Sequence, residues 1–186
     1  MRIIAGEKKS LILRSPRGRS SRPTADRVKE SMFAIIGNMQ GARILDLFAG
    51  SGSLAIEALS RGAQEAVLVD NSPQAIACIK ENLQHTDLSD KARVMAMPVT
   101  RALRVLQREG NDFDLILMDP PYNKNIVTPT LQALSDGSLV RLNALVVVEH
   151  TSKEEVGPGI ANLTCVRQEL YGDTMITFMR RNDSVK

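Results

Sequence analysis

Short apolar runs alternate with helical patterns over most of this chain, and this alternation restricts the fold more than any other feature. Strand patterns fall at 43–48, 65–70, 92–97, 113–118 and 144–149, and helical patterns at 53–61, 73–85, 100–109 and near 126–135. Alternation of this kind predicts an α/β fold with a mostly parallel sheet and helices on both faces. Two further β-rich runs, 163–171 and 174–180, surround Gly172-Asp173 and predict a closing hairpin with one antiparallel strand.

The residues before this alternation predict a small extension. Residues 2–6 and 10–13 resemble two short strands, and residues 15–21 are rich in Pro, Gly, Ser and Arg, as loops are. Thr24 is a suitable cap for a helix that ends at Gly37. A chain of 186 residues is long enough for one substantial core. We therefore expect a single domain over 1–186, with a basic hairpin and loop at 1–22 and a Rossmann-like core at 23–181.

A glycine turn (residues 48–52) follows the first strand of the alternation. Gly50 and Gly52 permit close backbone approach and unusual φ values. Asp46 lies four residues before Gly50, where a carboxylate would repel a pyrophosphate but attract a sulfonium. Asp70 ends the next strand, 20 residues after Gly50, where an acid can accept hydrogen bonds from both ribose hydroxyls. This order favours S-adenosylmethionine (SAM) over NAD, although a strand that ends in a solvated acid is the plainer reading of Asp70 alone.

An Asp-Pro-Pro-Tyr turn (residues 119–122) follows the apolar run 113–118. The prolines fix φ and bias the residues before them towards extended geometry, so the turn should be stiff. The carboxylate of Asp119 and a main-chain carbonyl can accept the two hydrogens of an amino group, while the ring of Tyr122 stacks on a flat base. This arrangement suits methylation of a base amine. The alternative is an acidic turn that only closes a strand.

Positive charge gathers at the start of the chain. Residues 1–30 hold nine Lys/Arg and three Asp/Glu, whereas the remaining residues hold 15 and 18. Such a basic segment can meet a phosphate backbone, and its alternative role is to keep the protein soluble. We expect nucleic-acid contact, with Arg17, Arg19 and Arg22 as RNA-binding residues.

Several classes of protein are disfavoured by composition. No apolar run approaches the roughly 20 residues that span a bilayer, and the N-terminus has no apolar segment typical of secretion. Cys78 and Cys165 lack metal-ligand spacing, and His85 and His150 stand apart from other ligand types. We therefore expect a cytoplasmic monomer without a metal.

These motifs together resemble the RsmD-type family of Class I SAM-dependent methyltransferases, which modify the exocyclic N2 of a guanine in small-subunit (16S) ribosomal RNA. The resemblance covers nearly the whole chain. Its most family-specific part is N-terminal, at residues 1–6 and 22–33, and it continues through residues 46–52, 57–62 and 119–122. The family implies a seven-stranded sheet whose last strand is antiparallel.

The resemblance also implies functional residues. SAM would be held by residues of the glycine turn and of the two strand ends beside it: Asp46, Phe48, Ala49, Gly50, Ser51, Gly52, Asp70 and Asn71. Asp119 and the carbonyl of Pro120 would each accept one amine hydrogen, and Tyr122 would stack on the base. The partner would be ribosomal RNA or an assembling small subunit. One departure concerns residues 97–100, which lack the acidic or amide side chain that often contacts the adenine.

Other activities fit the same turn less well. A DNA adenine-amine methyltransferase uses similar chemistry, but no segment is long enough for a separate element that reads a DNA groove. Protein glutamine methyltransferases commonly carry Asn in place of Asp119. A cytosine carbon methyltransferase needs a nucleophilic Cys, and neither Cys78 nor Cys165 lies in a strand-end turn. A ribosome-assembly factor that binds SAM only structurally is the non-enzymatic alternative.

Overall fold

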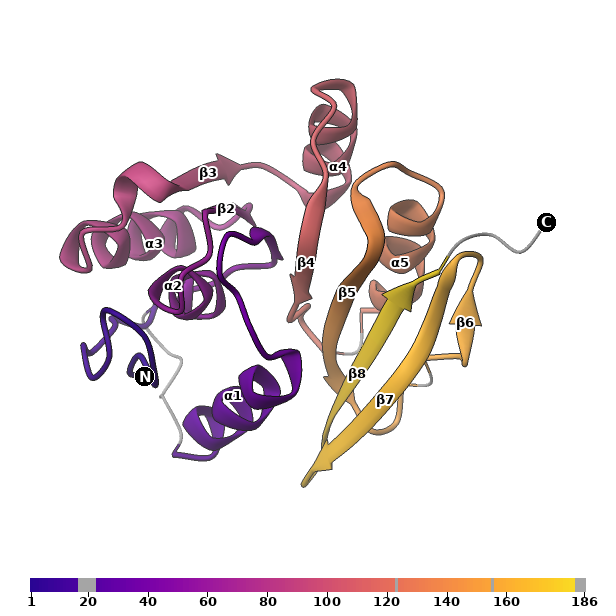
Figure 1. Ribbon diagram of the computed structural model, residues 1–186, viewed down its shortest axis with the longest axis horizontal. Helices are drawn as coiled ribbons and strands as arrows, with labels where there is room; N and C mark the ends of the chain where they lie inside the picture. The colour runs from indigo at the N-terminus through magenta and orange to yellow at the C-terminus, as the bar shows by residue number, and fades with distance from the viewer. Residues whose placement is uncertain (17–22, 123, 155, 183–186) are drawn as a thin grey trace. The chain divides into compact units, whose positions relative to one another are not determined.

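The computed structural model describes residues 1–16, 23–122, 124–154 and 156–182. Its contacts divide the chain into two compact units, Met1–Val99 and Thr100–Lys186. Figure 1 shows the elements of each unit, with the first in indigo to magenta and the second in pink to yellow. A single domain over 1–186 stays a prediction.

The first unit is built on three parallel strands in the order β3-β2-β1. The strands are β1 (Arg43–Leu47), β2 (Glu65–Asp70) and β3 (Ala92–Ala96), and the helices are α1 (Pro23–Ile36), α2 (Ser53–Ser60), α3 (Pro73–His85) and the 3-10 helix η1 (Ser89–Lys91). Helix α2 packs against β1 and β2, and α3 packs against β3. Helix α1 begins one residue before Thr24, its expected cap, and Gly37 follows it with a φ of 85°.

The second unit combines a parallel pair with a hairpin, in the strand order β4-β5-β8-β7-β6. Its elements are α4 (Val99–Arg108), which begins at the boundary, β4 (Phe113–Met118), α5 (Val127–Ser135), β5 (Val140–Thr151), β6 (Gly159–Ile160), β7 (Leu163–Tyr171) and β8 (Thr174–Arg181). Strand β5 is parallel to β4 and antiparallel to β8, which in turn is antiparallel to β7. The predicted closing hairpin is therefore confirmed.

The described residues contain eight strands, so the expected count of seven is wrong. The additional strand is β6, which has two residues and runs antiparallel to β7. The pairing of this segment with β7 is extended by a hydrogen bond from the Cys165 N–H to the Pro158 carbonyl oxygen (2.9 Å). A pair of residues is too short to show strand periodicity in a sequence, which is why the pattern missed it.

The central strands are buried along most of their length. Ile44–Leu47, Ala66–Val69 and Leu115–Met118 are buried without interruption, and so are Val146–Val148. Strands covered on both faces read as continuous apolar runs rather than alternating ones. The α/β class predicted from these runs is thus confirmed.

The N-terminal segment (residues 1–14) lies on α2 and α3 instead of forming a regular hairpin. Its two halves are joined by one antiparallel bridge, between Arg2 and Ile12, and by main-chain hydrogen bonds from the N–H groups of Ile3, Ser10 and Leu13. The Glu7 N–H donates to the carbonyl oxygen of Ser60 (2.7 Å), and a Cβ at Gly6 would overlap that same oxygen. Gly6 has a φ of 85°, so glycine is required there by both space and conformation.

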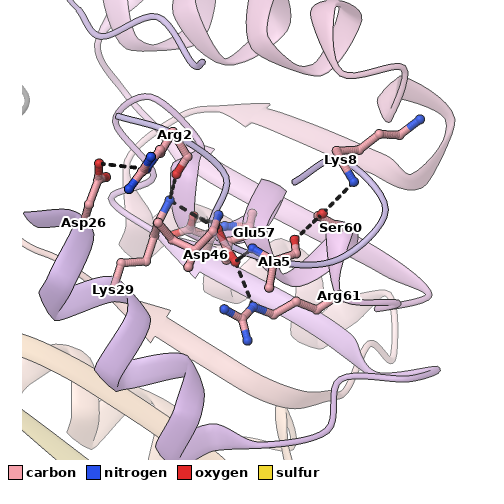
Figure 2. A network of polar contacts seen from close by, with 11 residues as sticks. Arg2, Ala5, Lys8, Asp26, Lys29, Asp46, Glu57, Ser60 and Arg61 are labelled. Atoms are coloured by element: carbon pink, nitrogen blue, oxygen red, sulfur yellow. Dashed lines mark hydrogen bonds and ion pairs between the residues drawn. The ribbon is translucent and has the colours of Figure 1, made fainter. Parts of the chain in front are cut away.

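Glu57 fastens this segment to α2, as Figure 2 shows. Its side chain is fully buried, and it accepts hydrogen bonds from the N–H groups of Ile4 (2.8 Å) and Ala5 (3.0 Å). Lys29 (3.3 Å) and Arg61 (2.8 Å) supply positive charge to the same carboxylate. Burial lowers the pKa of Lys29, although the charge of Glu57 raises it. The buried carboxylate is thus paired with cations and with main chain, as a buried charge must be.

Candidate active site

The glycine turn joins β1 to α2 through three residues with positive φ. Phe48 (64°), Gly50 (58°) and Gly52 (77°) all adopt the left-handed region. A Cβ at Gly52 would lie 3.0 Å from the Leu68 side chain, so glycine also fits the space there. Phe48 is the exception, because a non-glycine residue in this region stores strain, and such strain gathers at functional sites.

Asp70 holds this turn in place at the end of β2. Its Oδ2 accepts a hydrogen bond from the Gly50 N–H (2.9 Å), and its Oδ1 accepts one from the Ser72 N–H (2.8 Å). A carboxylate has about four acceptor sites, so further capacity is left for ligand hydroxyls. Asn71, the neighbouring predicted contact, is exposed. The sequence indicated an acid at this place, but not that it also fixes the glycine turn.

Asp46 lies beneath the turn, near the end of β1. Its side chain is almost fully buried, and Oδ2 accepts a hydrogen bond from the Ala55 N–H in the first turn of α2 (3.2 Å). Helix N-termini carry unsatisfied N–H groups and partial positive charge, so a carboxylate is stabilised there. Its interaction with a sulfonium stays a prediction.

Asn82 is a contact of the turn that the sequence reasoning missed. Its fully buried Nδ2 donates to the carbonyl oxygen of Ser51 (2.9 Å) and to that of Arg14 (2.9 Å). Its Oδ1 accepts from the Arg14 N–H (2.8 Å). The sequence feature that could have indicated a buried role for Asn82 is its position on the same face of α3 as Cys78 and Ile79. Asn82 thereby ties both the turn and the N-terminal segment to α3.

The Asp-Pro-Pro-Tyr turn begins directly after β4, as predicted. Asp119 is half-buried and Pro120 buried, whereas Pro121 and Tyr122 are exposed. The prolines leave this stretch with no N–H donors at two successive positions. A carboxylate and a carbonyl oxygen therefore follow one another at the strand end, beside an accessible ring.

The ring of Tyr122 is held through its hydroxyl group. The hydroxyl donates to Glu149 Oε1 (3.0 Å) at the end of β5, and Thr174 Oγ1 lies 3.5 Å away at the start of β8. Partial burial raises the pKa of Tyr122 to about 12, and the negative charge of Glu149 contributes, while the hydrogen bond with Thr174 lowers the pKa. At neutral pH the hydroxyl is protonated and remains a donor. Glu149 and Thr174 were not predicted as site residues.

Three further predictions concern the RNA-binding arginines, the absence of a metal site and the absence of a membrane span. Arg17, Arg19 and Arg22 lie outside the described residues. Arg14, their described neighbour, is exposed and paired with Glu81 (2.7 Å). In the described ranges there is no group of three or more side chains that could hold a metal ion. Over the same ranges, no helix combines the length and apolarity needed to cross a membrane.

Comparison with solved structures places this arrangement among the Rossmann-like methyltransferases. The chain is similar to yhhF from Escherichia coli, described as a candidate methyltransferase. The TM-score is 0.82 at 30% sequence identity, and 98% of each chain is covered. This likeness shows a Rossmann-like methyltransferase fold, and the chain is a methyltransferase.

Sequence comparison identifies the family. Residues 1–180 match the family model described as Conserved hypothetical protein 95, and the chain belongs to this family, the RsmD family. It is 37% identical over 182 residues to YlbH of Bacillus subtilis, described as a candidate rRNA methyltransferase, with 97% of this chain and 99% of the relative covered. It is 30% identical to ribosomal RNA small subunit methyltransferase D of Escherichia coli, with 97% and 90% covered. The resemblance stated from the motifs is confirmed.

Proposed function

We propose that this protein transfers a methyl group from SAM to the exocyclic N2 amine of a guanine in small-subunit ribosomal RNA. The observation that carries the proposal is the Asp-Pro-Pro-Tyr turn at the end of β4, with an acidic side chain, a carbonyl and an accessible aromatic ring in succession. The name of the Escherichia coli relative supports the RNA substrate.

The residues around the glycine turn fit SAM. Gly50 and Gly52 allow close approach of a ligand to the main chain, and Asp70 has acceptor capacity beyond its two N–H bonds. Asp46 supplies negative charge beneath the turn, which suits a cation and not a pyrophosphate. We propose that these residues, with Phe48, Ala49, Ser51 and Asn71, hold the cofactor. When bound, SAM supplies a methyl group on a positively charged sulfur that leaves as a neutral thioether.

The proposed role of the Asp-Pro-Pro-Tyr turn is to orient the amine. A guanine amine is neutral near pH 7 but a poor nucleophile, because its lone pair is delocalised into the ring. Asp119 and the Pro120 carbonyl would each accept one hydrogen, which localises the lone pair and stabilises the developing positive charge. Alignment of two reactants can lower a barrier by about 7–11 kcal/mol. After transfer, Asp119 is the acceptor for the released proton.

The aromatic ring of Tyr122 would hold the base itself. Stacking of a base on an aromatic side chain is worth roughly 1–3 kcal/mol and requires an unstacked base. The target guanine must therefore be unpaired or flipped out of its helix. We propose that the protein acts in the cytoplasm, where ribosomal RNA and assembling small subunits would be met, and that it acts as a monomer.

The proposal is tested with radiolabelled SAM and three separate substrates: naked ribosomal RNA, small ribosomal subunits and DNA. Label should enter RNA, as N2-methylguanine after digestion, and should not enter DNA. Asp119→Ala should raise the activation free energy of the single-turnover reaction by about 2.7–4 kcal/mol, as loss of a transition-state hydrogen bond does. The affinity for SAM should change little. Asp119→Asn keeps one acceptor oxygen and should retain part of the activity. Labelled DNA, or an Asp119→Ala rate equal to that of the wild type, would refute the proposal.

We also propose that Arg17, Arg19 and Arg22 bind the RNA backbone. Each phosphate neutralised on a single strand contributes about −0.7 to the slope of log affinity against log salt. A triple Ala variant should therefore show a slope shallower by about two units, with unchanged SAM binding. Filter-binding titrations across salt concentrations measure this. An unchanged slope would mean that the basic segment is only solubilising.

A further inference from the structure

Tyr122 is anchored at the far end of its side chain, by groups from two neighbouring strands. Glu149 and Thr174 lie near the ends of β5 and β8, which pair so that Glu149 is opposite Ile176 and Thr151 opposite Thr174. The phenol has one hydrogen, and it is donated to Glu149 at 3.0 Å. Thr174, at 3.5 Å, is the longer contact. The carboxylate is therefore the main anchor.

An anchor of this kind solves a physical problem for an exposed ring. Tyr122 is 42% exposed, so packing alone does not fix its rotamer. The two prolines stiffen the main chain before it but leave χ1 and χ2 of the tyrosine free. Immobilising a side chain on binding costs conformational entropy, and a ring fixed beforehand avoids this cost. A hydrogen bond to a charged acceptor is also stronger than one between neutral groups.

We propose that Glu149 is a positioning residue that holds the Tyr122 ring in the orientation in which it stacks on the target base. This inference rests on the proposed function. Glu149 would act through the tyrosine hydroxyl and not on the substrate, which separates it from Asp119. The alternative, a second carboxylate that takes the proton of the amine, would act whether or not residue 122 has a hydroxyl.

Two features of the chain supply matched controls. Glu169 lies on β7 opposite the same Ile176, and its carboxylate accepts from Arg167 Nε (2.7 Å) instead of from a tyrosine. Tyr171 is the second of two tyrosines, and the chain has no tryptophan. Glu169→Gln and Tyr171→Phe thus change the same residue types on β7, where Tyr171 is opposite Thr174 in the strand pairing, whereas the hydroxyl that Glu149 binds is that of Tyr122.

The functional test is a double-mutant cycle in single-turnover methylation of ribosomal RNA. Tyr122→Phe removes the hydrogen bond and should raise the half-saturating RNA concentration roughly 3- to 20-fold, with a smaller effect on the maximal rate. Glu149→Gln keeps an acceptor oxygen but loses the charge that strengthens the bond, so it should raise this concentration in the same direction but by less. In the Tyr122→Phe background, Glu149→Gln should have less than about a twofold further effect. The two control variants should match the wild type. An equal loss from Glu149→Gln in both backgrounds, or no loss in the wild type, overturns the proposal.

The anchor is also tested without RNA. In a Tyr171→Phe protein, Tyr122 is the only tyrosine, so the absorbance of its phenolate reports its own titration. Its pKa should lie at about 12 and should fall on Glu149→Gln, because removal of a negative neighbour favours the phenolate. Circular dichroism at each pH confirms that the fold persists. A titration unaffected by Glu149→Gln would overturn the anchor, whereas failure of the wild type to methylate any RNA would overturn the proposed function alone.

Discussion

Three buried or half-buried carboxylates of the first unit bind main chain, whereas Glu65 and Glu81 of the same unit pair with arginine side chains. In the first unit, Asp46, Glu57 and Asp70 accept hydrogen bonds from main-chain N–H groups and so fix the path of the chain around α2. In the second unit, Asp114, Glu149 and Glu169 accept from side chains, namely those of Arg141, Tyr122 and Arg167. The first arrangement shapes a loop, whereas the second orients side chains. This division is consistent with the proposed roles of the glycine turn in holding SAM and of Tyr122 in holding the base.

We expect the largest loss of stability on substitution of Glu57. Glu57→Ala would leave Lys29 and Arg61 beside two unpaired N–H groups in a buried site, and should lower the free energy of unfolding by about 3–5 kcal/mol. Urea denaturation measures this. Glu65→Ala is the matched control in the same unit, since its pair with Arg43 is partly exposed and should contribute no more than about 1 kcal/mol. Equal losses in the free energy of unfolding would show that the main-chain hydrogen bonds of Glu57 add no stability beyond that of a partly exposed ion pair.

Asp70 has both a structural role and a proposed role in ligand binding, so its removal should affect both the turn and the affinity for SAM. Asp70→Ala removes the acceptor of the Gly50 and Ser72 N–H groups and should weaken SAM binding by about 1.5–3 kcal/mol. Isothermal titration calorimetry gives the affinity, and the wild type should bind NAD negligibly. Unchanged SAM affinity in this variant would remove Asp70 from the site.

Arg141 should give the smallest effect. It bonds Asp114 (2.9 Å) and Asp112 (3.0 Å), and these hydrogen bonds raise its pKa, but all three side chains are more than a third exposed. Solvent screens such pairs, so Arg141→Ala should lower the free energy of unfolding by at most about 1 kcal/mol. A loss as large as that of Glu57→Ala would contradict the distinction between the two units.

The sequence predicted the central elements well, because buried parallel strands are continuous apolar runs. Strands β2, β4 and β7 and helix α3 have the expected bounds, and the other predicted elements of the alternation and hairpin differ by few residues, except that β5 extends to Val140–Thr151. Gly50, Asp70 and Asp119 lie at the strand ends where the motifs placed them. Local pattern was sufficient in each of these cases.

Long-range polar contacts could not be predicted in the same way. The expected N-terminal hairpin forms only in part, with one bridge and a few main-chain hydrogen bonds, since the N–H groups of Ile4 and Ala5 bind Glu57 instead of a partner strand. Glu57, Asn82 and Glu149 each act on residues at least 27 positions away. An acid or amide within an apolar segment signals a buried partner, but nothing in the local sequence identifies that partner.

The N-terminal segment has a consequence for the order of events during synthesis. Its contacts with Glu57 and Asn82 span 53 and 68 positions, so the residues of this segment leave the ribosome well before their binding surface on α2 and α3. At about 5–20 residues per second, that delay is roughly 3–14 seconds. During this time Ile3 and Leu13, both buried in the finished protein, remain exposed. A basic and glycine-containing segment is well suited to stay in solution until α2 and α3 have formed.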